Sequence, residues 1–273
     1  MRGRPLNALA VAACVGLAGP AFAQSVEVPY RAVLDGVEIG AGALVIDVDG
    51  SGGGYRLELH ALLPERNASK AVRATAHAAG RITRGSLQPE LYSADFDKAG
   101  TKSRVALAFA DGAVRMVAVL PPHPAGSGRT RPPESQSRGV IDPLSALVVP
   151  AARGGLAPLS ACGRTQRIFD GVTRYDVALF PSRVETIEVA GSALATLVCR
   201  AELRSNLGPT PRLRRWPETR PQGLRALIWL APVADGRLLA PARMETDLRF
   251  GRLVIEATEP GAFHTAVRAA ALR

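Results

Sequence analysis

The cysteines are the residues of this chain whose chemistry is most constrained by type and position. There are three, Cys14, Cys162 and Cys199, and Cys14 lies in an apolar N-terminal stretch that resembles an export signal. Once that stretch is removed, two cysteines remain, and an even pair in an exported protein indicates one disulfide. The alternative, a redox-active pair, is less favoured because no C-x-x-C spacing is present to activate a thiol. We therefore predict a structural bridge between Cys162 and Cys199.

The other chemically active residue types form no recognisable catalytic pattern. The sequence contains no H-E-x-x-H, no G-x-S-x-G nucleophile elbow and no G-x-x-x-x-G-K phosphate loop. The histidines are not at metal-ligand spacing, and we expect them to lie at the surface. We therefore predict no catalytic residue, no metal site and no cofactor. The four histidines are His60, His77, His123 and His264.

The first 23 residues have the three parts of a secretory signal. A positively charged start is followed by an apolar stretch at residues 6–18 and by an A-x-A site that ends at Ala23. Cleavage after Ala23 predicts a periplasmic protein with no transmembrane segment in the mature chain. The alternative is a lipid anchor at Cys14, which small residues precede. Residues 15–23 stay apolar, which favours soluble export.

The rest of the chain shows short alternating segments separated by Gly, Pro and Asp, a pattern typical of antiparallel strands. Residues 55–59 alternate apolar and polar side chains. Residues 105–119 form the clearest hairpin, because Asp111 and Gly112 suit a tight turn with two positive φ angles. The pattern predicts a mainly β fold, a single curled antiparallel sheet or an open, spiral-like barrel, formed by one domain over residues 24–273.

Two short segments are predicted to be helical. Residues 70–79 are rich in Ala and poor in β-branched side chains. A second helix is expected to start with Asp142 as N-cap and Pro143 in the first turn, and to run over residues 144–149. Residues 121–139 contain almost no apolar side chain and predict a flexible loop inside the domain, because β patterning resumes on both sides.

The chain has a formal net charge of +10, which raises the question of an anionic partner. Aromatic residues make up only 5% of the chain. Nucleic acid is disfavoured as a partner because the protein carries an export signal and has few aromatics for base stacking. Outside the cytoplasm the anionic partners are membrane lipids and cell-wall polymers. The candidate anionic-surface patch, whose alternative is a solvated loop, consists of Arg212, Arg214, Arg215 and Arg220.

Two stretches are specific enough to compare with known families: D-P-x-S-A-L at residues 142–147 and F-D-G-x-x-R-Y-D at residues 169–176. Together with weaker matches over nearly the whole mature chain, they resemble a family of exported proteobacterial proteins known only as a domain of unknown function. The resemblance implies a β-rich periplasmic domain associated with envelope upkeep and supplies no catalytic residues. The matched positions, compatible with structural roles as caps, turns and an ion pair, are Asp142, Ser145, Asp170, Arg174, Tyr175 and Asp176.

These features lead to one functional hypothesis and two alternatives. We expect a non-enzymatic envelope-maintenance protein that binds a lipid-like or anionic envelope component, or a partner protein, because a curled sheet has a concave face that can shelter acyl chains. The first alternative is a structural scaffold without a small ligand, in which side chains of the protein fill the interior. The second is a cell-wall or lipid hydrolase, which requires two carboxylates, or a Ser and a His, to converge in a cleft.

Overall fold

The chain folds almost entirely as β-strands. The computed structural model describes residues 22–50, 53–63, 71–83, 85–98, 100–121, 137–151, 161–207 and 225–263. Within these residues there is one 14-stranded sheet and a single 3₁₀ turn, η1 (Ser145–Leu147). The strands are β1 (Phe22–Leu34), β2 (Val37–Asp49), β3 (Gly54–Leu63), β4 (Val72–Thr83), β5 (Ser86–Lys98), β6 (Thr101–Ala110), β7 (Ala113–Leu120), β8 (Val149–Pro150), β9 (Arg164–Phe169), β10 (Arg174–Val189), β11 (Ser192–Leu207), β12 (Arg225–Val233), β13 (Leu238–Leu248) and β14 (Gly251–Ala257).

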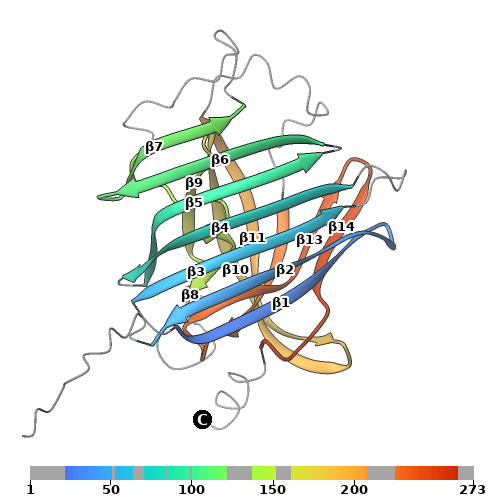
Figure 1. Ribbon diagram of the computed structural model, residues 1–273. Helices are drawn as coiled ribbons and strands as arrows, with labels where there is room; N and C mark the ends of the chain where they lie inside the picture. Colours follow the sequence, from blue (N-terminus) through green and yellow to red (C-terminus); the bar gives the residue numbers. More distant parts are fainter. Residues whose placement is uncertain are drawn as a thin grey trace, which may run out of the picture.

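Two up-and-down meanders make up the sheet. Strands β1 to β7 form the N-terminal half, β9 to β14 form the C-terminal half, and the halves join where β1 pairs antiparallel with β14. In Figure 1 the N-terminal strands lie in front, and the C-terminal strands cross steeply behind them. Strands β7 and β9 are the two ends of this order, and the sheet is not closed into a barrel. The predicted mainly β fold with a curled, open sheet is confirmed.

Tight turns at Asp-Gly pairs connect several of the strands, as the sequence predicts. Between β6 and β7, Asp111 and Gly112 have φ angles of 52° and 67°, and Asp35 and Gly36 repeat this pattern between β1 and β2. Two consecutive positive φ angles match the right-handed twist of the flanking strands, and Asp and Gly tolerate them best. These turns fix the register of the hairpins that they close.

The predicted helix at residues 70–79 is wrong, because the described part of this segment is strand β4. On the inner face of this strand, Ala78 pairs with Leu57 of β3 on one side and with Tyr92 of β5 on the other. All three side chains are buried. Small residues are needed here beside an aromatic ring, and pairing on both edges outweighs the weak helix preference of alanine.

The second predicted helix is much shorter than expected. It consists of the single turn η1, after which Val149 and Pro150 form strand β8 against β13. Its N-cap is Leu144 and not the predicted Asp142. Asp142 lies two residues earlier, and its Oδ1 accepts hydrogen bonds from the backbone N–H groups of Leu144 at 3.0 Å and Ser145 at 2.8 Å. The predicted signal therefore marked the approach to the turn and not its N-cap or its length.

The hydrophobic core lies between the two halves of the sheet. Inward-facing residues of β2, such as Leu44 and Ile46, meet residues of the C-terminal half, such as Leu194 and Leu238. The inner faces are thus packed with the protein's own side chains. The largest side chains that are almost completely buried include Tyr55, Phe169 and Phe263.

Candidate functional site at the open edge of the sheet

A segment that crosses between the two ends of the sheet organises the candidate site. We call residues 137–150 the crossing segment. Arg138 bridges to Ala113 at the start of β7, and Ile141 bridges in parallel to Ile168 of β9. The Ile141 N–H donates to the Arg167 carbonyl at 2.8 Å. The crossing segment therefore contacts both end strands, while β7 and β9 do not pair with each other.

A buried polar cluster anchors the crossing segment to the sheet. The Tyr55 hydroxyl of β3 and the Ser145 hydroxyl of η1 are 2.8 Å apart. Asp142, Ser145 and Tyr55 are at most 1% exposed. Oδ1 of Asp142 accepts hydrogen bonds from the backbone that leads into η1, whereas its Oδ2 is buried without a hydrogen-bond partner among the described residues. Ser145 and Asp142 therefore lie close together, but both are fully buried and do not contact solvent.

Burial controls the ionisation of this cluster. Removal from water raises the pKa of Asp142 to about 6, although hydrogen bonds from Ser145 and the backbone oppose the rise. Burial also raises the pKa of Tyr55, Tyr92 and Tyr175 well above the usual range, and the nearby Asp142 adds to each rise. The phenols therefore stay neutral, and Asp142 is the one member of this group that titrates near physiological pH.

The remaining motif positions shape the turn between β9 and β10. Oδ1 of Asp170 accepts hydrogen bonds from the N–H groups of Val172 at 2.8 Å and Thr173 at 2.7 Å. At the start of β10, Nε of Arg174 lies 3.4 Å from Oδ1 of Asp176. The structure gives these residues contacts that stabilise a turn and a strand end, next to the buried cluster.

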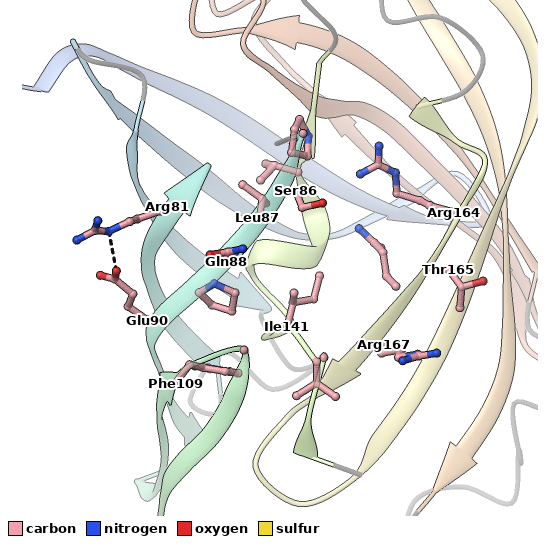
Figure 2. A pocket seen from close by; sticks show the side chains of 18 of the residues that line it. Arg81, Ser86, Leu87, Gln88, Glu90, Phe109, Ile141, Arg164, Thr165 and Arg167 are labelled. Carbon is pink, nitrogen blue, oxygen red and sulfur yellow. Dashed lines mark hydrogen bonds and ion pairs between the residues drawn. The ribbon is translucent and has the colours of Figure 1, made fainter. Parts of the chain in front are cut away.

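Above the crossing segment lies a cleft of about 1110 Å³. Residues of β5, of the turn between β6 and β7, of the crossing segment and of β9 line it. Figure 2 shows Leu87 and Gln88 of β5 on one side, Arg164 of β9 on the other and Ile141 between them. This volume is slightly above the usual range of small-molecule sites. Its apolar lining includes Leu87, Pro89, Phe109, Val140, Ile141 and Val148.

Arg164 differs from the other charged residues of the cleft. Arg81 pairs with Glu90 at 2.9 Å, and Asp111 pairs with Arg115 at 2.9 Å. Arg164 is half-buried, and its Nε is buried without a hydrogen-bond partner among the described residues. Burial accordingly lowers the pKa of its guanidinium. The described residues leave this positive charge without a compensating carboxylate.

The predicted disulfide is present and supports the β9 side of the cleft. Cys162, two residues before Arg164, is bonded to Cys199 of β11, with the Cα atoms 5.6 Å apart. Both cysteines are fully buried in a small core with Leu197 and Leu230. Strand β10 lies between β9 and β11. The bond therefore ties the start of the end strand to a more central one. A disulfide is typical of proteins in oxidising compartments.

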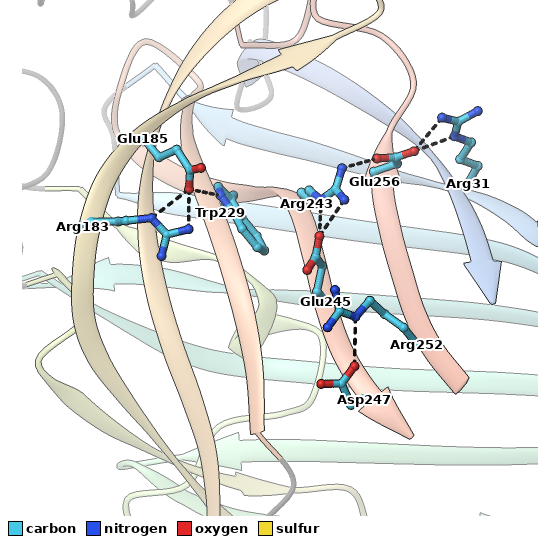
Figure 3. A network of polar contacts seen from close by, with 9 residues as sticks. All are labelled: Arg31, Arg183, Glu185, Trp229, Arg243, Glu245, Asp247, Arg252 and Glu256. Carbon is cyan, nitrogen blue, oxygen red and sulfur yellow. Dashed lines mark hydrogen bonds and ion pairs between the residues drawn. The ribbon is translucent and has the colours of Figure 1, made fainter. Parts of the chain in front are cut away.

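The outer face of the C-terminal half carries a ladder of compensated charges (Figure 3). Glu256 bridges Arg31 of β1 at 2.6 Å and Arg243 of β13 at 2.8 Å. On neighbouring strands, the Trp229 indole and then the guanidinium of Arg183 hold the pKa of Glu185 below its usual value. The ladder shows how arginines on this protein are normally satisfied, in contrast to Arg164.

Several predicted features fall outside the site. His60 and His77 flank Glu58 on an exposed face of β3 and β4, as expected for surface histidines. Within the described ranges, no three His, Cys, Asp or Glu side chains gather as a metal-binding group. No described helix is long and apolar enough to cross a membrane. The residues outside the described part of the chain include His123, His264, the four arginines of the predicted anionic patch and most of the predicted loop.

Two important residues were not predicted from the sequence. Tyr55 was placed on an alternating face, but its partner Ser145 is 90 positions away. Arg164 precedes the apolar end of β9 and has no sequence neighbour that marks its charge as uncompensated. The motif D-P-x-S-A-L did identify the crossing segment.

The open sheet and its edge cleft define a β protein with a ligand-sized site at its open edge. The chain belongs to the family described as "Protein of unknown function (DUF3108)", whose model matches residues 26–258. No curated protein and no solved structure matches the chain.

Proposed function

We propose that this protein is a non-enzymatic protein of the bacterial periplasm that binds an apolar or anionic component of the cell envelope in its edge cleft. The cleft between β5 and β9, with the crossing segment as its floor, is the observation that carries this proposal. Its volume suits a small amphipathic molecule. The predicted signal and the disulfide both support a location outside the cytoplasm.

Binding is favoured over catalysis by what the cleft exposes. The Ser145 and Asp142 side chains are 0% exposed, so a substrate in the cleft does not contact them. Two carboxylates line the cleft, Glu90 and Asp111, and both are paired with arginines. Arg81, Arg164 and Arg167 also line it. A hydrolase needs an exposed base or nucleophile, whereas a binding site needs complementary apolar and charged surfaces.

The test is the binding of an apolar fluorophore, N-phenyl-1-naphthylamine, to the purified mature chain. We expect saturable binding to one site. The Gln88→Trp variant places an indole in the cleft from an exposed position on β5 and should weaken binding at least about fivefold. Thr186→Trp, on an exposed position of β10 that does not line the cleft, is the matched control. Non-saturable binding, or equal binding by wild type and Gln88→Trp, contradicts the proposal.

A structural scaffold is the second candidate, and the packed interior favours it. The concave face expected to shelter a ligand is filled by core residues such as Tyr55, Phe169 and Phe263. A scaffold binds neither the fluorophore nor any small amphiphile. The titration above therefore separates the two candidates directly.

A further inference from the structure

The position of Arg164 is fixed by the structure around it. It is the first residue of β9, two positions after the disulfide-bonded Cys162. Further along the strand, Nε2 of Gln166 donates to the Ala146 carbonyl of η1 at 3.2 Å. In Figure 2 the Arg164 guanidinium extends from β9 toward the β5 side of the cleft. The backbone of Arg164 is therefore fixed on both sides, so little conformational entropy is lost there when a ligand binds.

The charge of Arg164 is unusual because it is both half-buried and uncompensated. Its Nε is buried with no acceptor in the described part of the chain, and no described carboxylate forms an ion pair with it. Arg167, three positions further along β9, also lines the cleft. A half-buried guanidinium without an acidic partner is costly, and an anion bound beside it in the cleft compensates its charge.

We propose that Arg164 binds the acidic head group, a phosphate or a carboxylate, of an amphiphile whose apolar part lies against Pro89 and Ile141. This inference rests on the proposed function and names the ligand class of the same cleft. A guanidinium binds phosphate and carboxylate through paired N–H donors, which a half-dry site strengthens. Pro89 and Ile141 are half-exposed in the cleft and offer apolar surface beside that charge. Arg167 adds a second positive charge.

The test compares decyl phosphate, decanol and inorganic phosphate by titration calorimetry. Wild type should bind decyl phosphate about tenfold or more tightly than decanol, because only the phosphate forms charge-assisted hydrogen bonds with the guanidinium. Inorganic phosphate alone should show no binding at the same concentrations. In the Arg164→Gln variant, decyl phosphate should bind no more than about twofold more tightly than decanol. Arg252→Gln is the control, because Arg252 is exposed, pairs with Asp247 and does not line the cleft.

Each contrary result identifies what fails. Equal binding of decyl phosphate and decanol to wild type overturns the head-group inference and leaves the proposed function standing, and this comparison needs no variant. A preference for decyl phosphate that persists in Arg164→Gln assigns the anion to another residue. Tight binding of inorganic phosphate alone overturns the inference that the ligand is an amphiphile. If no probe binds, the proposed function itself fails.

Discussion

The hydroxyl groups of Tyr55 and Ser145 lie 2.8 Å apart although 90 residues separate them, and both are buried. Tyr55 belongs to β3 in the N-terminal half, and Ser145 belongs to the single turn of the crossing segment. Through this contact the floor of the cleft is fixed to the sheet. The position of the cleft therefore depends on a buried polar contact as well as on strand pairing.

A double-mutant cycle tests whether this contact stabilises the fold. Tyr55→Phe leaves the Ser145 hydroxyl without this partner in a buried place and should lower the free energy of unfolding by about 1–2 kcal/mol. Ser145→Ala should have a similar effect. The double variant should be less destabilised than the sum of the two, with a coupling of about 0.5 kcal/mol or more, measured by urea unfolding. Strict additivity would show that the hydroxyls do not interact.

Gly80 of β4 is predicted to be intolerant of any side chain. A Cβ at this position would overlap the Gln88 carbonyl oxygen and would lie 2.8 Å from the Tyr55 hydroxyl oxygen. Gly80→Ala should therefore destabilise the protein by about 1–3 kcal/mol, because β5 must move away. Gly261→Ala is the control, since nothing lies within 4 Å of its Cβ. Thermal unfolding of both variants provides the measurement, and equal melting temperatures would contradict the close packing of β4 on β5.

The buried Asp142 predicts a specific pH dependence of stability. Burial raises its pKa to about 6, above its value of about 3.9 in an unfolded chain. Between these values the folded state binds the proton more tightly, so this group's contribution to stability falls as pH rises from about 4 to about 6. Acidification from pH 7.5 to pH 5 should stabilise wild type, relative to Asp142→Asn, by on the order of 1 kcal/mol.

Urea unfolding of wild type and Asp142→Asn at the two pH values measures this difference. The pH-dependent contributions of the carboxylates that the two proteins share cancel in the comparison. Asp170→Asn is a matched control, because Asp170 also accepts two backbone hydrogen bonds, but from a part-buried turn. This control should follow the pH dependence of wild type. If Asp142→Asn does so as well, Asp142 is not the group that titrates.

Removal of the disulfide should destabilise the protein. Its cysteines are 37 residues apart in sequence, and closing such a loop contributes about 3.8 kcal/mol in the chain-entropy description. In oxidising buffer Cys162→Ser should therefore unfold at clearly lower urea than wild type. In reducing buffer the wild type should lose most of this advantage. A variant that unfolds together with wild type in both buffers would show that the bridge does not stabilise the folded chain.

Local patterns predicted most of the strands and turns. The alternation over residues 55–59 and the Asp111-Gly112 turn are each decided by neighbouring residues, so they could be read directly. The disulfide followed from counting the cysteines of a chain that is predicted to be exported. The helix prediction for residues 70–79 was wrong because it relied on the helix preference of alanine. At Ala78 a small side chain is instead required by the neighbours Leu57 and Tyr92 on the adjacent strands.

The site could be predicted only in part because its partners are far apart in sequence. Asp142 signalled the start of a turn, and the turn is there. Nothing in the sequence indicated that Ile141 would pair with Ile168 or that β7 and β9 would remain apart. The charge of Arg164 is conspicuous in the fold because the guanidinium is half-buried with no acidic partner among the described residues, and this property depends on three-dimensional contacts.

The central claim, that the edge cleft binds an envelope amphiphile, is tested most directly by native mass spectrometry of the exported protein purified without detergent. Wild type should carry one bound molecule per chain, which fragmentation identifies as an acyl chain with a phosphate or carboxylate. Gln88→Trp should carry none, and Thr186→Trp should match wild type. Wild-type protein that repeatedly shows the mass of the bare chain, or the same bound molecule on Gln88→Trp, would contradict the account.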